Sequence, residues 1–226
     1  MANDHVAIDG PVSSGKTTVS QRLAAKTGHL YLDTGAMYRA VAFLALTNGV
    51  DLDNGAALAA MLSHHRVEIV PDHAATAGYR IAIDGADTGD RPFDPDVAAA
   101  VSSVAALPHV RGELVTRQRA IAAQGPVVMA GRDIGTVVLP DARFKFFLTA
   151  SVDERARRRH AEFAERGIAV PFDEVRAGIA ERDRLDMTRA TSPLRPADDA
   201  VTIDSTELEA EDVVERMVAI MQGARA

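Results

Sequence analysis

The sequence predicts an α/β fold: a mostly parallel five-stranded sheet covered by helices on both faces. Five short apolar segments alternate with stretches of helical periodicity along the 226 residues. Parallel neighbours in a sheet need long crossover connections, which helices usually supply. The first apolar segment also runs straight into a glycine-rich loop and then a helix. In such sheets ligands bind beyond the carboxyl ends of the strands, so functional residues are sought there.

The first quarter of the chain alternates strands and helices. The run 5–9 is short and apolar, and residues 30–32 give a second strand. A helix is expected at 16–27, with Val19 and Leu23 four residues apart and Gly28 as a stop signal. Further helices are expected at 35–47, which Asn48-Gly49 closes, and at 55–62.

Residues 64–92 break this alternation. The segments 66–70 and 79–83 look like antiparallel strands joined by the loop 71–78, and Tyr79, Ile81 and Ile83 alternate with polar or smaller residues. We expect a small antiparallel insert here.

The rest of the chain returns to helices and strands. Two helical stretches are separated at Pro108, and three further apolar segments follow. The expected helices are 96–106, 109–123, 153–165, 173–187 and 207–221, and the expected strands are 126–130, 144–148 and 201–204.

Composition excludes several classes of protein. With no cysteine there is no disulfide, thiolate nucleophile or zinc-cysteine site, and no histidines have HExxH spacing. The net charge of −7 disfavours a groove for polymeric nucleic acid. No apolar run approaches the roughly 20 residues that span a bilayer, and the first strand follows the N-terminus without a signal-like segment. We therefore expect a cytoplasmic protein that acts on a small anionic ligand.

The segment 10–17, GPVSSGKT, fits the phosphate-binding pattern GxxxxGK[ST] between a strand and a helix. Its backbone N–H groups and the helix N-terminus would hold phosphate oxygens. Lys16 would reach the β- and γ-phosphates of ATP, and the Thr17 hydroxyl would coordinate Mg²⁺. The candidate ATP-binding residues are Gly10, Pro11, Val12, Ser13, Ser14, Gly15, Lys16, Thr17 and Thr18.

Two segments after strands carry candidate acceptor residues. The first, 33–39, follows the second strand and offers Thr34, Gly35, Tyr38 and Arg39; an arginine here suits bidentate binding of a phosphate. The second is GRDIGT, 131–136, with Arg132 and Asp133 directly after a strand. Helix capping explains Thr34 and Gly35 equally, and a local ion pair explains Arg132 and Asp133.

Arginines in two later helices are candidates for binding phosphate groups. Arg182, Asp186 and Arg189 have the spacing of one helical stripe, although salt bridges on a solvated helix explain the first two. A basic cluster begins the helix at 153–165, where a solvated charged face is the plain alternative. Phosphoryl transfer needs charge stabilisation that arginines commonly supply. The cluster comprises Arg155, Arg157, Arg158 and Arg159.

Taken in order, these segments resemble the bacterial cytidylate kinase family over essentially the whole chain. They are the phosphate loop, LDTGAMYRA, VSSVAALPHVR, GRDIGTVVLPDA, RARRR and RDRLDMTRATSPL. The resemblance implies a P-loop three-layer fold with an antiparallel insert in the monophosphate-binding region, a short helical lid and a monomeric state. It divides the single domain of 1–226 into a core of about 1–34, 109–150 and 190–226, a monophosphate-binding region of about 35–108 with its insert at 64–92, and a lid region of about 151–189.

The resemblance also implies roles for individual residues. Ser102, Arg111 and Asp133 would face the cytosine, and a carboxylate is the group that accepts from its N4 amine. Asp186 with Arg182 would hold the ribose. The α-phosphate would be bound by Arg39, Arg132 and Arg189, and the transferred group would meet the lid arginines Arg155, Arg158 and Arg159.

The reaction expected is transfer of the γ-phosphoryl group of ATP to CMP or dCMP, with Mg²⁺. Alternatives are another acceptor such as UMP, dTMP or shikimate, a nucleotide-binding switch or assembly ATPase, and a noncatalytic descendant. The last alternative arises because Ala130 stands where the family usually has an acidic residue before GRD.

Overall fold

The chain forms the five-stranded sheet and the small antiparallel sheet that the sequence predicts, and the small sheet has three strands. The computed structural model describes residues 4–72 and 79–223. The elements are β1 (Val6–Asp9), α1 (Lys16–Thr27), β2 (Leu30–Asp33), α2 (Thr34–Asn48), α3 (Gly55–His64), β3 (Val67–Pro71), β4 (Tyr79–Ile83), β5 (Ala86–Asp87), η1 (Arg91–Phe93), α4 (Pro95–Ala106), α5 (Pro108–Ala122), β6 (Val127–Gly131), η2 (Ile134–Val138), β7 (Phe144–Thr149), α6 (Val152–Glu165), α7 (Phe172–Thr188), β8 (Val201–Asp204) and α8 (Ala210–Gly223).

The five-stranded parallel sheet has the order β2-β6-β1-β7-β8, so the chain's first strand is central. Asp9 pairs in register with Gly131 on β6 and with Phe147 on β7. The carboxyl end of β1 therefore lies beside the residues that follow β6. This edge is where ligands bind in open α/β sheets.

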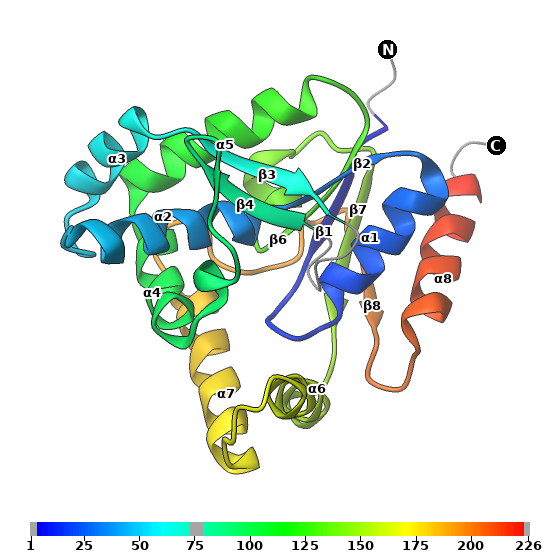
Figure 1. Ribbon diagram of the computed structural model, residues 1–226. Helices are drawn as coiled ribbons and strands as arrows, with labels where there is room; N and C mark the ends of the chain where they lie inside the picture. The colour runs from blue at the N-terminus through cyan, green and yellow to red at the C-terminus, as the bar shows by residue number, and fades with distance from the viewer. Residues whose placement is uncertain (1–3, 73–78, 224–226) are drawn as a thin grey trace. The chain divides into compact units, whose positions relative to one another are not determined.

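Helices α1 and α8 cover one face of this sheet, and Figure 1 shows them side by side in blue and red. Val19 and Leu23 of α1 share a buried cluster with Val214 and Met217 of α8. These helical residues pack on strand residues that face them from every second position, which gives the sheet its apolar support. The strand residues are Val6, Ile8, Val128, Phe144, Phe146, Leu148 and Ile203.

The chain separates into two compact units, 1–31 with 126–226, and 32–125. In the second unit α2 packs on α4, and α3 packs on α5. Their contacts bury Val41, Leu58, Val104 and Leu114. The division of the domain predicted from sequence stays a prediction.

The antiparallel insert is confirmed, with one strand more than expected. β3 pairs with β4 in antiparallel register, and the short β5 pairs with the end of β4. Asp84 and Gly85, both with positive φ, make the tight turn between β4 and β5. The strand β5 was not predicted because its two residues are too few to show an alternating pattern. Residues 73–78 of the predicted loop lie outside the described residues.

Within the described residues, no helix is long and apolar enough to cross a bilayer.

Candidate functional site

The glycine loop between β1 and α1 has a backbone that only its glycines allow. Gly10 has a φ of 154°, and a Cβ at this position would lie 2.0 Å from the carbonyl oxygen of Leu148. Gly15 precedes α1 with a φ of 88°. Any larger residue at these two positions would strain the turn or displace β7. The loop therefore delivers its N–H groups to the N-terminus of α1, where phosphate groups bind.

Lys16 lies folded over this loop. Its Nζ donates to the carbonyl oxygen of Pro11 at 2.5 Å and to Ser14 Oγ at 3.3 Å, and the residue is only 9% exposed. Ser14 Oγ donates to the same Pro11 carbonyl at 3.0 Å. The positively charged ammonium group of Lys16 therefore lies at the loop, where phosphate groups would bind. Thr17 and Thr18 follow in the first turn of α1, the former partly buried and the latter exposed.

Asp9, the last residue of β1, is a site residue that the sequence interpretation missed. Its two carboxylate oxygens accept from the backbone N–H groups of Ile134 at 2.7 Å and Gly135 at 2.8 Å. The carboxylate therefore fixes the start of η2, immediately after Asp133. The available signal was a carboxylate ending an apolar strand directly before Gly10.

Burial raises the pKa of Asp9 to about 6. The N–H groups of Gly135 and Ile134 oppose this shift because they stabilise the charged form, and the charge of Lys16 also opposes it. The negative charge of Asp133 adds to the rise in pKa. Asp9 thus combines two strong hydrogen bonds with an unfavourable buried charge.

Arg132, Asp186 and Arg189, all predicted site residues, lie together. Arg132 Nε donates to Asp186 Oδ2 at 3.0 Å, and Arg189 Nη1 lies 4.0 Å from Asp186 Oδ1. The Asp186 side chain is 6% exposed, so this carboxylate orients two guanidinium groups in a largely buried setting. Two arginines converging on one point suit an anionic ligand.

The predicted helical stripe holds for Arg182 and Asp186 but not for Arg189. α7 ends at Thr188, and Arg189 has extended backbone angles with φ −61° and ψ 141°. Its Nε instead donates to the carbonyl oxygen of Ser192 at 2.6 Å. The turn after the helix, rather than helical spacing, brings Arg189 to Asp186.

Arg155 is the most buried of the arginines predicted for the lid, at 4% exposure. Its Nη1 and Nη2 donate to the two carboxylate oxygens of Asp183 at 3.0 and 2.6 Å. The same guanidinium donates to the carbonyl oxygens of Ala150 and, at 3.3 Å, of Val12 in the glycine loop. In this structure Arg155 links α6 to α7 and to the loop, so its predicted contact with a transferred phosphoryl group stays a prediction.

Arg158 also contacts the region of the glycine loop. Its Nη2 donates to the carbonyl oxygen of Ser205 at 2.6 Å, and its Nη1 would lie 3.6 Å from a Cβ on Gly15. Ser205 Oγ in turn donates to the carbonyl oxygen of Ser14 at 3.2 Å. Arg158 is therefore held beside the loop from the end of β8.

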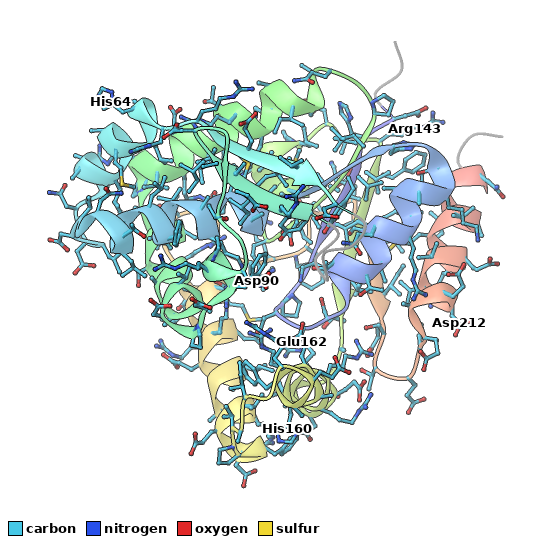
Figure 2. All side chains as sticks on the ribbon, in the orientation of Figure 1. His64, Asp90, Arg143, His160, Glu162 and Asp212 are labelled. Carbon is cyan, nitrogen blue, oxygen red and sulfur yellow. The ribbon has the colours of Figure 1, made fainter. Side chains whose placement is uncertain are left out.

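Arg159 has a different environment on the same helix. It pairs with Glu162 at 2.6 Å, and its guanidinium carbon lies 4.4 Å from the centroid of the Phe163 ring. Figure 2 labels Glu162 and, two residues earlier on α6, His160, whose ring meets Phe172 of α7 edge to face at 5.9 Å. The three arginines predicted for the lid thus differ: Arg155 and Arg158 are bound near the loop, and Arg159 lies along α6.

The unit 32–125 carries the other acceptor candidates. Asp33 caps α2 by accepting from the N–H of Gly35 at 2.9 Å. The helix start predicted at Thr34 and Gly35 is confirmed, but the capping residue is Asp33. Thr34 is buried at the first position of α2, and Arg39 lies one turn after Gly35 with its guanidinium carbon 5.4 Å from the ring centroid of Phe93.

Arg111 and Tyr38 lie together in the same unit. The Arg111 guanidinium carbon is 5.6 Å from the Tyr38 ring centroid, and Arg111 Nη1 donates to the carbonyl oxygen of Ala105 at 3.1 Å. Ser102 is partly buried on α4, one turn before Ala105. Tyr38, Ser102 and Arg111 thus belong to one unit, on α2, α4 and α5 respectively, while Asp133 belongs to the other unit.

Comparison with known proteins finds one family. The sequence profile described as cytidylate kinase matches residues 6–223. The chain is 49% identical to the cytidylate kinase of Geobacillus kaustophilus over 96% of its own length and 95% of that protein. It is also 49% identical to the cytidylate kinase of Pelotomaculum thermopropionicum, over 98% and 97% of the two chains. Among solved structures, an uncharacterised protein from Eubacterium ventriosum shares the fold, with a TM-score of 0.53 and 12% identity over 98% of this chain and 99% of that one.

Replacing Asp9 by Asn should change how stability depends on pH. A carboxyl group whose pKa is higher in the folded chain than in the unfolded chain binds more protons when folded, between about pH 4 and pH 6. Its contribution to stability is therefore full below that window and falls as pH rises through it. Relative to the Asp9→Asn variant, the wild-type free energy of unfolding should fall by about 2 kcal/mol from pH 4 to pH 7, measured by urea unfolding.

Asp204→Asn is the matched control, since Asp204 also ends a strand of the same sheet. Hydrogen bonds from the Thr206 side chain and backbone lower the pKa of Asp204, so its contribution should instead be lost as pH falls. A stability difference between wild type and Asp9→Asn that stays constant with pH would contradict the raised pKa.

Proposed function

Because the chain belongs to the cytidylate kinase family, we propose that it transfers the γ-phosphoryl group of ATP to CMP or dCMP, giving ADP with CDP or dCDP. The observation that carries this proposal is the family match over residues 6–223, which includes the glycine loop and every candidate acceptor residue. The reaction belongs to pyrimidine nucleotide metabolism.

The chemistry needs no covalent intermediate with the enzyme. An oxygen of the CMP phosphate attacks the γ-phosphorus of ATP in line, and the bond from that phosphorus to the β,γ-bridging oxygen breaks. The electron pair leaves with ADP. Positioning of the two substrates and neutralisation of the phosphate charges supply most of the rate enhancement in such transfers.

The donor side is assigned to the glycine loop and its neighbours. The loop N–H groups and Lys16 bind the β- and γ-phosphates, and Lys16 gives up its bond to the Pro11 carbonyl for phosphate oxygens. Arg158 and Arg155, which already contact the surroundings of the loop, stabilise the charge of the transferred group. Arg159 joins them from α6.

Mg²⁺ fits this donor side. Among the described residues no three His, Cys, Asp or Glu side chains are grouped so that they could hold a metal ion. Mg²⁺ bound to a nucleotide keeps several waters and takes few protein ligands, so the Thr17 hydroxyl at the start of α1 would suffice as a protein ligand. Bound there, the ion would supply positive charge against the phosphates of ATP.

The acceptor residues are assigned to three parts of the nucleotide: the base, the sugar and the phosphate. Ser102, Arg111 and Asp133 read the cytosine, with Asp133 accepting from the N4 amine. Asp186 and Arg182 hold the ribose, and binding there requires Asp186 to share its present contacts with Arg132 and Arg189. The phosphate is bound by Arg39, Arg132 and Arg189, with Thr34, Gly35 and Tyr38 alongside.

We also propose how the chain is divided into regions, where in the cell the protein acts and its oligomeric state. The core is about 1–34, 109–150 and 190–226, the monophosphate-binding region about 35–108 and the lid region about 151–189. The lid excludes water during transfer, since water would otherwise hydrolyse ATP. The protein acts in the cytoplasm as a monomer, without membrane or polymeric nucleic acid as a partner.

The test of this function is an acceptor panel. ADP formation is measured from ATP and Mg²⁺ with CMP, dCMP, UMP, AMP, GMP, dTMP or shikimate, and without acceptor. Turnover should occur chiefly with CMP and dCMP. Equal turnover without acceptor would identify an ATPase, and no turnover with any acceptor would favour a noncatalytic descendant, in which case Ala130→Asp tests the missing carboxylate.

Asp133→Ala should remove the preference for cytosine over uracil. Loss of a base-reading carboxylate should lower kcat/KM for CMP by roughly 10- to 100-fold, because such contacts discriminate by about 1–3 kcal/mol, and should affect UMP far less. Asp141→Ala, an exposed carboxylate a few residues further on, is the control and should behave as wild type. Equal losses with CMP and UMP would count against cytosine reading by Asp133.

A further inference from the structure

Tyr79 connects the antiparallel insert to the start of α2 within the unit 32–125. It opens β4, is 4% exposed and donates from its hydroxyl to Asp33 Oδ2 at 3.1 Å. Its ring also lies against that of Phe93 in η1, with centroids 6.2 Å apart and planes at 43°. One side chain of the insert thus contacts two separate segments of the chain.

The first contact acts through the cap of α2. Asp33 uses one carboxylate oxygen to cap the N–H of Gly35 at 2.9 Å and the other to accept from Tyr79. A carboxylate held by two donors has its side-chain rotation fixed, so the first turn of α2 is fixed with it. That turn contains Thr34 and Gly35, both acceptor candidates.

The second contact acts through the ring of Phe93, which forms an aromatic platform beside Arg39. The guanidinium carbon of Arg39 on α2 lies 5.4 Å from the Phe93 centroid, and that of Arg91 on η1 lies 5.2 Å from the centroid of Phe43, one turn after Arg39. These reciprocal cation–π contacts hold η1 on α2. Contact with the Phe93 ring limits where the Arg39 guanidinium can lie, so the ring helps to set the position from which Arg39 can donate.

We propose that Tyr79 is a positioning residue for the acceptor phosphate: through Asp33 and Phe93, the insert sets the first turn of α2 and the position of the Arg39 guanidinium. This inference rests on the proposed function. Tyr79 touches neither reacting group. Its effect should therefore fall on binding of the acceptor and leave binding of ATP unchanged.

The fold of the insert does not depend on the Tyr79 hydroxyl. β4 is held by its ladder to β3 and by the buried side chains of Ile81 and Ile83, which face the same way as the Tyr79 ring. Tyr79→Phe keeps the ring beside Phe93 and removes the hydroxyl that donates to Asp33. A change in acceptor binding then reports on positioning rather than on loss of the insert.

Tyr79→Phe should raise KM for CMP roughly fivefold, the factor that corresponds to loss of one typical hydrogen bond, with KM for ATP unchanged. Initial rates are measured with CMP varied at saturating ATP and with ATP varied at saturating CMP. Arg80→Gln is the matched control: Arg80 is the next residue of β4, faces away and pairs with Asp72 and Asp87. It should have wild-type values of both KM constants.

A second pair of variants tests the platform without touching Tyr79. Phe93→Leu removes the ring under Arg39 and should raise KM for CMP in the same selective way, whereas Phe93→Tyr keeps a ring and should restore the wild-type value. These variants decide the matter if Tyr79→Phe does not fold.

An unchanged KM for CMP in Tyr79→Phe, or in Phe93→Leu, overturns the inference while leaving the proposed function intact. A parallel rise of both KM constants with a lowered Tm also overturns it, because that pattern marks general loss of structure. Absence of turnover with CMP in the wild-type protein overturns the proposed function, and this inference with it.

Discussion

The buried carboxylate of Asp9 is the constraint on which the geometry of the phosphate-loop unit depends. It ends the central strand, precedes the glycine loop and accepts from two backbone N–H groups of η2. A carboxylate without partners is very costly to bury, so these two donors determine where the segment after Arg132 and Asp133 can lie. One side chain thereby couples the loop assigned to ATP with the loop assigned to the acceptor.

The glycine loop is held from a second direction by α6 and α7. Val12 packs with the small cluster of Ala156, Val175 and Ile179, and its carbonyl oxygen accepts from Arg155. The Arg155–Asp183 pair joins the two helices to each other. A displacement of these helices from the loop has to give up the contacts of Val12 and of Arg158 with the loop and β8. Phosphoryl transfer needs charges brought to a fixed point, and these contacts hold Arg155 and Arg158 beside the loop that we propose binds ATP.

Sequence patterns predicted most of the fold because its elements carry local signals. The helix at 16–27 was predicted to the residue, since the glycine loop starts it and Gly28 ends it. The strand β5 was not predicted, because its two residues are too few to show a periodic pattern. Arg189 was placed on a helical stripe by spacing, whereas a turn after Thr188 brings it to Asp186. The spacing of residues along a helical stripe does not show at which residue the helix ends.

Contacts between distant segments could not be predicted from residue type. Asp9 looked like the end of a strand, and its partners Ile134 and Gly135 lie 125 and 126 residues away. Tyr79 looked like one alternating residue of a strand, although its hydroxyl meets Asp33 at a separation of 46 residues. Asp183 lies between two arginines in the sequence and was not a predicted site residue, yet it is the ion-pair partner of Arg155. Each of these roles arises only when the fold brings backbone donors or arginines to a buried carboxylate.

The most direct test of the Asp9 constraint is amide hydrogen exchange of Ile134 and Gly135, followed by NMR. If the carboxylate holds both N–H groups, they should exchange as slowly as the amides of the β1–β6 ladder, and both should become faster in Asp9→Asn while that ladder stays protected. Exchange in the wild-type protein as fast as in an exposed loop would show that Asp9 does not hold this segment.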